Sequence, residues 1–183
     1  MLLTAMRLYC HAVRRVVEFV GKSVSYVMPA LAFVVAFEVF SRYFLNKPTI
    51  WAYDLSLFMF GYIAALGGAY AQQRRGHINV DILYNKVPPR IRSLFNLFSF
   101  ALGIFFLVIV CKMSVGKFEE AIEFNYRRQS EWAPHMHHFW VMICIASSLL
   151  IAQLSSDWLD DAVHLFTGKR LLPELNVDDE DDA

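Results

Sequence analysis

Charged residues are scarce in this sequence, and that scarcity weighs against a soluble protein. Asp, Glu, Lys and Arg make up 19% of the 183 residues, whereas an average globular chain contains ~25%. Hydrophobic residues account for 57% of the chain and aromatic residues for 15%. The net charge is zero, but the charges are clustered: cations gather near the start and around residues 72–92, and the chain ends in DDEDDA.

Paired cysteines are missing as well. Cys10, Cys111 and Cys144 show no regular spacing, and the last two lie in apolar runs. An odd number of thiols in apolar surroundings argues against a disulfide framework. It favours cysteines that pack as small apolar side chains.

The sequence also lacks the motifs that carry enzyme chemistry. It has no phosphate-binding loop, no nucleophile elbow and no HExxH helix, so it predicts neither an ATP-driven machine nor a hydrolase. His135, His137 and His138 lie near Glu131, but their spacing matches no regular zinc site. A membrane enzyme with a metal centre in this cluster is the weaker alternative. The sequence predicts no enzyme, no metal and no cofactor in this chain.

Long apolar segments are what the sequence does contain. A bilayer core about 30 Å thick is crossed by ~20 mostly apolar helical residues, and four segments fit, at about 24–45, 51–72, 92–112 and 139–157. They show almost none of the polar stripes of a soluble helical bundle. The sequence therefore predicts an all-α integral membrane protein with four transmembrane helices, in a membrane domain over residues 23–160.

Three segments outside these spans carry charge. Residues 1–22 predict a basic amphipathic helix on an anionic leaflet, with a plain cytosolic extension as the alternative. Residues 77–88, which lead into a double proline, predict an interfacial helix, with an ordinary basic loop as the alternative. Residues 161–183 predict an acidic cytoplasmic tail. The apolar stripe of the first helix consists of Leu2, Met6, Tyr9, Val13, Val16 and Val20. The arginines expected to anchor lipid are Arg14, Arg15, Arg74, Arg90 and Arg92.

The distribution of cations predicts the topology. If both termini face the cytoplasm, the inner segments hold eleven of the 17 Lys and Arg residues. Cytoplasmic segments of membrane proteins are enriched in these residues. An N-in, C-in arrangement is therefore expected.

Polar residues near the outer side are candidates for contacts with other subunits. Glu38 and Arg42 lie four residues apart toward the outer end of the first span, and they either pair with each other or anchor a partner. In the outer loop over residues 119–138, Arg127 and Arg128 either dock a partner on the outer side or are simply solvated, as such charges more often are.

A stripe of small residues runs along the second span and includes Gly61, Ala65 and Gly68. Such a stripe lets helix backbones approach closely in lipid. It serves either packing within the four spans, which we favour, or a seam with another subunit.

The run RYFLNKPTIWAYDLSLFMFGYIAALGGAYAQQRRGHINVDIL, residues 42–83, closely resembles the signature of DctQ-type small membrane subunits of tripartite ATP-independent periplasmic (TRAP) transporters. In that signature an Arg-Tyr ends the first span, a short loop leads to Trp near an acidic residue, and basic residues precede a Gly-His segment with an Asp. The matching positions are Arg42, Tyr43, Asn46, Trp51, Asp54, Gly67, Arg75, Gly76, His77, Val80 and Asp81. Tyr53 stands where the family commonly has a second acidic residue.

The resemblance implies an accessory scaffold rather than a carrier. The implied partners are a large elevator-type membrane subunit, a periplasmic solute-binding protein and the phospholipids of the bacterial inner membrane, with no nucleic acid. Uptake of an organic acid coupled to Na+ is implied, with the Na+ site in the large subunit. The residues expected at scaffold contacts are Glu38, Arg42, Asn46, Trp51, Asp54, Gly61, Ala65, Gly68, Arg75, His77 and Asp81.

The alternative is a self-contained four-span channel or carrier that acts as a homo-oligomer. Transport sites commonly use internal repeats and helices interrupted by Gly or Pro in corresponding positions, and the sequence shows neither. A channel would also need a continuous polar face on one span, which none of the four segments has. The residues by themselves therefore favour a scaffold.

Overall fold

The computed structural model describes residues 2–74, 89–168 and 171. Within these residues the chain is helical, with one isolated antiparallel bridge between Arg127 and His135. The predicted interfacial helix over residues 77–88 and the end of the acidic tail lie outside the described residues. The helices are α1 (Leu2–Ser25), α2 (Val27–Tyr43), α3 (Ala52–Gln73), α5 (Pro89–Glu123) and α6 (His137–Thr167).

Four of the described helical segments are long and apolar enough to cross a membrane. They are Leu3–Tyr43, which joins α1 to α2, and Ala52–Gln73, Leu94–Glu123 and His137–Leu165. The predicted fold class of an all-α membrane protein with four transmembrane helices is therefore confirmed. Which end of the helices faces the cytoplasm stays a prediction.

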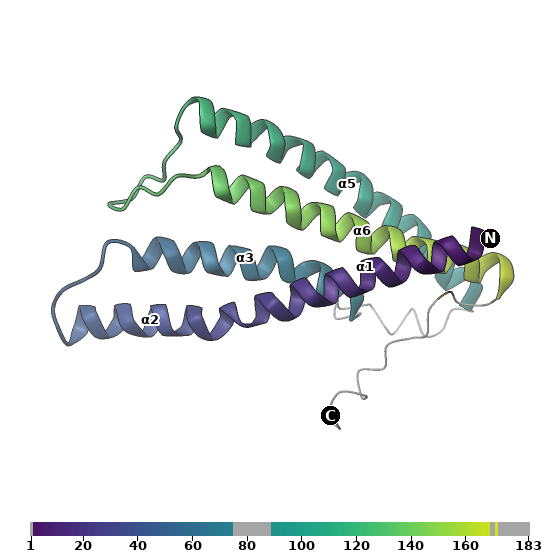
Figure 1. Cartoon of the computed structure of the whole chain (residues 1–183), viewed down its shortest axis with the longest axis horizontal. Helices are drawn as coiled ribbons and strands as arrows, with labels where there is room; N and C mark the ends of the chain where they lie inside the picture. The colour runs from purple at the N-terminus through teal and green to yellow at the C-terminus, as the bar shows by residue number, and fades with distance from the viewer. Residues whose placement is uncertain (1, 75–88, 169–170, 172–183) are drawn as a thin grey trace, which may run out of the picture.

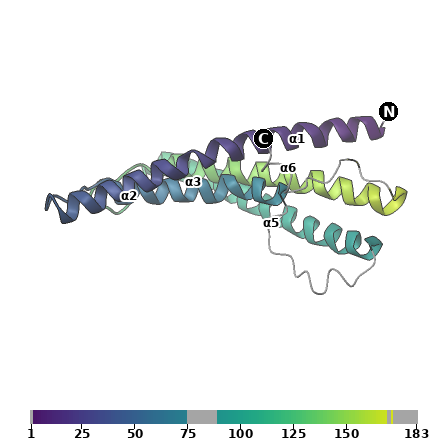
Figure 2. The same ribbon diagram turned by 90° about the horizontal axis from the view of Figure 1, so that it is seen from below.

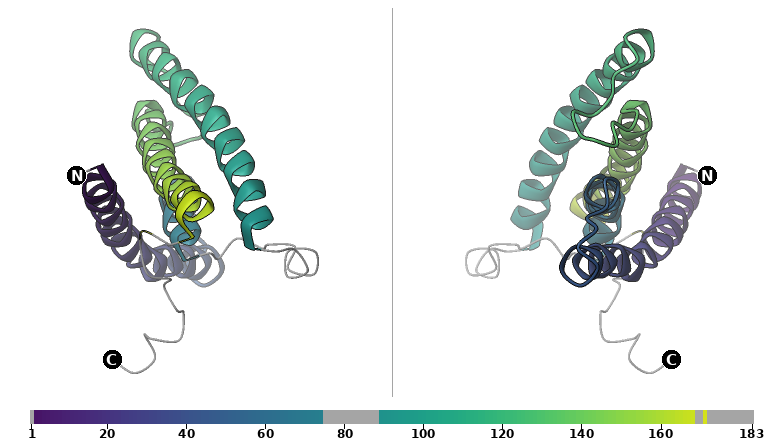
Figure 3. Two further views of the ribbon diagram at one scale, coloured as in Figure 1. Left: turned by 90° about the vertical axis from the view of Figure 1, so that its right-hand side faces the viewer. Right: turned by 90° about the vertical axis from the view of Figure 1, so that its left-hand side faces the viewer.

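The four spanning helices form an open row rather than a closed bundle. They lie side by side in the order α2, α3, α6, α5 (Figure 1), since α3 packs on α2 and α6, and α5 packs on α6. Viewed end-on, α6 lies between α1 and α5 (Figure 3). The helices at the two ends of the row leave most of their side chains uncovered, and no residue of the most apolar stretch of α5 is buried.

Helix α1 leads almost directly into α2, with only Tyr26 between them. It runs across α3 and α6 (Figure 2). The Tyr9 hydroxyl lies 2.7 Å from Ser155 Oγ on α6. Cys10 and Val17 are fully buried against the row. Neither residue belongs to the predicted apolar stripe, of which Met6, Val13 and Val20 are half-buried, whereas Tyr9 and Val16 are exposed. The face of α1 that packs on protein therefore overlaps only one side of the predicted stripe.

Two of the helices, α5 and α6, are longer than the predicted spans. At 1.5 Å per residue, α3 with 22 residues is about 33 Å long, whereas α5 with 35 and α6 with 31 are about 52 Å and 46 Å. α6 therefore includes the first residues of the predicted tail and ends at Gly168, whose left-handed φ of 69° suits glycine. Beyond it, Leu171 N donates to Asp160 Oδ1 at 2.6 Å, and Leu171 packs with Cys10.

Amide side chains hold the acidic residues of α6 at the end away from the described loops. Gln72 of α3 donates to Asp157 Oδ2 at 3.1 Å, and Gln153 donates to Asp157 Oδ1 at 2.9 Å. Asn96 of α5 donates to Asp161 Oδ2 at 2.8 Å. Polar contacts of this kind join helices that lipid alone would not drive together.

The closest approach of α1 to α3 gives a first test. A Cβ atom at Gly21 would lie 2.3 Å from Cγ of Tyr70, so Gly21→Ala must displace the Tyr70 ring or the helix. We expect a loss of about 1–3 kcal/mol in the free energy of unfolding, the usual cost of overpacking. Thermal unfolding of the full chain in detergent measures it.

Gly67→Ala is the matched control, because a Cβ at Gly67 would meet nothing within 4 Å. It should unfold at or slightly above the temperature of the unchanged chain. Equal unfolding temperatures for the two variants would show that α1 is not held against α3 at Gly21.

Candidate functional site

Two clusters of polar residues lie at the end of the row where the α2–α3 turn and the α5–α6 loop come together (Figure 1). The first, the Glu38 cluster, consists of Glu38, Arg42 and Thr49. The second, the Asp54 cluster, consists of Asp54, Arg128 and Ser130. Four of these six residues are among those that the sequence singled out.

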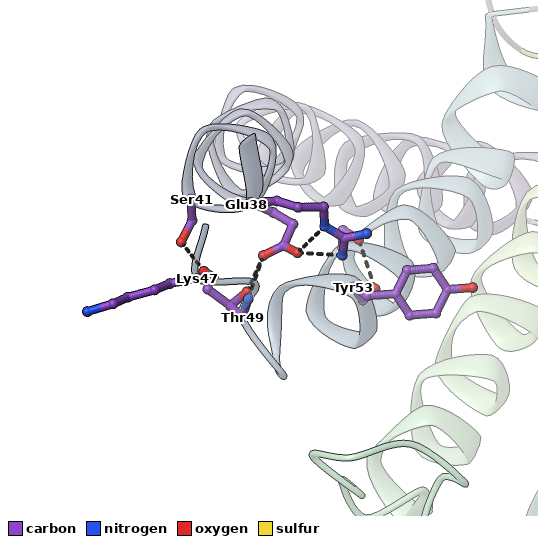
Figure 4. A network of polar contacts seen from close by, with 7 residues as sticks. Glu38, Ser41, Lys47, Thr49 and Tyr53 are labelled. Atoms are coloured by element: carbon purple, nitrogen blue, oxygen red, sulfur yellow. Dashed lines mark hydrogen bonds and ion pairs between the residues drawn. The ribbon is translucent and has the colours of Figure 1, made fainter. Parts of the chain in front are cut away.

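The Glu38 carboxylate joins α2 to the turn that follows it (Figure 4). Its Oε1 atom accepts hydrogen bonds from Arg42 Nη2 at 2.6 Å and Nε at 3.2 Å. Its Oε2 atom accepts bonds from the Thr49 backbone N at 3.1 Å and from the Thr49 hydroxyl. The Glu38 side chain is 13% exposed and the Arg42 side chain 55%. The pair is thus satisfied internally, while Arg42 keeps an exposed edge.

The backbone of the α2–α3 turn is fixed by local contacts. Ser41 Oγ donates to the Lys47 carbonyl at 2.5 Å, and Lys47 N donates to the Ser41 carbonyl at 3.1 Å. Asn46 has a left-handed φ of 51°, a conformation that Asn tolerates better than most residues. Trp51, which directly precedes α3, stacks on Phe37 of α2 with ring centroids 6.0 Å apart. Asn46 and Trp51 therefore shape the turn.

The Asp54 cluster buries a carboxylate in the first turn of α3. The Asp54 side chain has no exposed surface. Its Oδ2 atom accepts a hydrogen bond from the Ser130 hydroxyl, and Arg128 Nε lies 2.7 Å from Oδ1. Because Oδ1 accepts no hydrogen bond from the described residues, the contact with Arg128 is an ion pair. The positive end of the α3 dipole also favours a carboxylate here.

Short backbone contacts shape the α5–α6 loop around this cluster. Arg128 N donates to the Pro134 carbonyl at 2.9 Å, and Met136 N donates to the Tyr126 carbonyl at 3.0 Å. Ala133 N donates to Ser130 Oγ at 3.2 Å, so the serine that binds Asp54 is itself positioned. The loop is thereby fastened to the start of α3.

The two loop arginines have different surroundings. The Arg128 side chain is 27% exposed and lies over the rings of Tyr53 and Phe58, 5.9 Å and 6.0 Å from their centroids. Such cation–π contacts add to the ion pair. Arg127 is exposed. Of the two, Arg127 is the one free of the Asp54 cluster, and contact of either with a periplasmic partner stays a prediction.

His138, in the first turn of α6, takes part in helix packing. Tyr62 of α3 is hydrogen-bonded to His138 Nδ1, and the Phe58 ring meets the His138 ring edge-on with centroids 4.8 Å apart. The described residues contain no group of three or more His, Cys, Asp or Glu that could hold a metal ion. The arrangement offers mechanical linkage between α3 and α6.

The small-residue stripe of α3 is only partly used inside the row. A Cβ at Gly61 would lie 3.5 Å from Cε2 of Phe139, which is ordinary contact with α6. A Cβ at Gly68 would meet nothing within 4 Å, and Ala65 is half-buried. Internal packing therefore explains Gly61 but leaves the surface at Gly68 open.

The remaining predicted site residues divide by location. Arg14 and Arg15 lie on α1, and Arg90 and Arg92 lie in the first turns of α5. The Arg74 guanidinium lies over the Tyr70 ring, 5.2 Å from its centroid. Arg75, His77 and Asp81 lie outside the described residues, so their expected contacts stay predictions.

Thr49 and Ser130 are partners that the sequence did not indicate. Each completes a carboxylate site, but the carboxylates lie 11 and 76 residues away along the chain. Such pairings arise from the fold and leave no local pattern. The Gln153–Asp157 pair does carry a signal, since the two residues are four apart on a helix.

Comparison with known proteins identifies the family to which this chain belongs. The family model described as "Tripartite ATP-independent periplasmic transporters, DctQ component" matches residues 31–163. The chain is similar to the C4-dicarboxylate TRAP transporter small permease protein DctQ of Vibrio cholerae, with 30% identity over 87 residues, 48% of this chain and 38% of that protein. It is also similar to the sialic acid TRAP transporter small permease protein SiaQ of the same organism, with 32% identity over 65 residues, 36% of this chain and 38% of that protein.

A third relative is the sialic acid TRAP transporter permease protein SiaT of Haemophilus influenzae. It is 32% identical over 74 residues, which are 40% of this chain but 11% of that protein. In each of the three relatives the match spans less than half of the relative's own length.

The four spanning helices and the family match define a multi-pass membrane protein of transporter type, not an enzyme. The chain belongs to the DctQ component family of the tripartite ATP-independent periplasmic transporters, a family of the inner membrane. The resemblance read from residues 42–83 is thereby confirmed.

Substitution of Asp54 tests whether the Asp54 cluster holds the α5–α6 loop against α3. Asp54→Ala leaves Arg128 and Ser130 without their buried partner, and breaking a buried pair in this way costs about 3–5 kcal/mol. We expect a lower unfolding temperature and faster amide hydrogen exchange across residues 124–136. Glu131→Gln, an exposed change in the same loop, is the control and should leave both unchanged. Unaltered exchange in Asp54→Ala would show that the cluster does not hold the loop.

Substitution of Thr49 tests the Glu38 cluster. Thr49→Val keeps the shape of the side chain but removes the hydroxyl that donates to Glu38 Oε2. We expect amide exchange over residues 44–50 to rise several-fold, because the turn loses one of its attachments to α2. Thr4→Val, on the exposed surface of α1, is the matched control. The same exchange in both variants would mean that Arg42 and the backbone amide of residue 49 hold Glu38 without the hydroxyl.

Proposed function

We propose that this chain is the small, stationary membrane subunit of a TRAP transporter, and that it braces a large membrane subunit that carries the solute. The solute class is an organic acid, and coupling to Na+ resides in the large subunit. A periplasmic solute-binding protein delivers the solute. The chain itself provides anchoring surface and rigidity.

The open row of helices carries this proposal. A pore within one chain needs helices arranged in a ring, whereas α2 and α5 stand at opposite ends of a row (Figure 1). The apolar surface of α2 and α5 is largely uncovered. That surface suits lipid on one side and another membrane protein on the other, because helices in lipid associate by close packing and polar contacts.

The relatives support a small-and-large pairing. Two are named small permease proteins, and the third is a permease protein of which the matching segment is 11%. A segment similar to this chain thus occurs as part of a larger permease. This arrangement supports a partner that lies beside the chain in the membrane.

The two ends of the row suggest the remaining partners. At the loop end, the exposed Arg127 and the exposed edge of Arg42 are available to a periplasmic solute-binding protein. At the other end, the exposed cations of α1, which include Arg7 and Arg15, suit the anionic headgroups of phospholipids.

Reconstitution separates this role from that of a self-contained carrier. Liposomes that hold the purified full chain alone should keep a C4-dicarboxylate or sialic acid gradient as well as protein-free liposomes do. Liposomes that hold the chain with its large subunit should show uptake when the binding protein and a Na+ gradient are supplied. Specific flux through the chain alone would favour the homo-oligomeric channel or carrier and refute the bracing role.

A further inference from the structure

Two thiols lie close together between α5 and α6, and the proposed transport role does not use them. Cys111 Sγ lies 3.3 Å from Cys144 Sγ, and both cysteines are free and half-buried. Cys111 Sγ also lies 3.8 Å from Ser148 Oγ. The third cysteine, Cys10, is fully buried in a different cluster beside Leu171. The chain therefore holds one thiol pair and one isolated thiol.

We propose that Cys111 and Cys144 are a reversible redox site, which forms an intrachain disulfide by thiol–disulfide exchange with a small disulfide. One thiolate attacks the small disulfide, forms a mixed disulfide and releases one small thiol. The second cysteine then attacks the mixed disulfide and releases the other small thiol. The two cysteines lose two hydrogens in total, and these appear on the two small thiols.

Proximity favours the second step. A disulfide bond is about 2.04 Å long, so each sulfur has to move by about 0.6 Å from the present 3.3 Å separation. Both cysteines lie on helices that pack along each other. The attack within the chain is therefore faster than a second attack by a free thiol, since the reacting groups are already together.

The position of the two cysteines along the helices lets a small disulfide reach them for the first step. Cys111 ends the uncharged run of α5, and Lys112 follows it directly. The pair thus lies near the edge of the apolar zone on the side of the α5–α6 loop. Under the predicted N-in, C-in topology this is the periplasmic side, where disulfides persist. The side of the membrane from which the small disulfide reaches the thiols depends on that topology. The closeness of the two thiols does not depend on it.

The test uses the full chain in lipid nanodiscs, with Cys10→Ser to leave only the pair, and 4,4′-dithiodipyridine as the small disulfide. We expect two thiopyridone molecules released per chain, no adduct on the protein, and linked Cys111 and Cys144 peptides that are lighter by two hydrogens. The link should form in a monomer and should open again with dithiothreitol. Peptide mapping of the chain with all three cysteines repeats the measurement without any substitution.

Single-thiol variants give the matched control. With Cys10→Ser, a further Cys111→Ser or Cys144→Ser change should stop the reaction at a stable mixed disulfide, with one thiopyridone released. Three outcomes would overturn the proposal: an adduct retained on each of the two cysteines, disulfides between two chains, or thiols that react only after denaturation. If the link forms only in inside-out vesicles treated with an impermeant disulfide, the thiol site stands and the predicted topology is wrong.

Discussion

The loop end of the molecule depends on a carboxylate that has no contact with solvent. Burying the Asp54 charge is costly unless it is paired and hydrogen-bonded, and its partners Arg128 and Ser130 come from the α5–α6 loop. The start of α3 and the loop must therefore be in place together. This requirement ties the α2–α3 hairpin to the α5–α6 hairpin, and the Tyr62–His138 contact extends the tie along α3 and α6.

Helix α1 supplies a second tie at the other end. It crosses both α3 and α6, and Gly21 allows it to approach Tyr70 closely. The Gln72–Asp157 bond joins α3 to α6 at a similar depth. An open row cannot rely on a shared core for rigidity, because the helices at its ends have a neighbour on one side only. Ties at both ends of α3 and α6 give the row a fixed shape.

The apolar spans and the family were predictable from sequence because both rest on local patterns. Charge-free runs mark membrane helices whatever their neighbours are, and the residues from Arg42 to Leu83 carry the family signature. The burial of Asp54 was not predictable, since it depends on a serine 76 residues away. The surroundings of Arg127 and Arg128 could not be distinguished either, because adjacent loop residues point in different directions only after the loop has folded. The extension of α6 past Asp160 was missed because charged residues beyond the bilayer look like a tail.

The charges near the ends of α5 and α6 bear on the proposed bracing role, because they affect how easily the row moves along the membrane normal. α5 carries Lys117, Glu119 and Glu120 near its loop end, and α6 carries Asp160 and Asp161 beyond its apolar stretch. A shift of the row by one helical turn, about 5.4 Å, would draw one of these sets toward the hydrocarbon. A charge at the centre of a spanning helix costs about 2.5–3.5 kcal/mol on insertion scales, and a charge drawn one turn inward from the edge costs part of that. Charges at both ends therefore oppose movement in either direction, which is the property that the proposed bracing role requires.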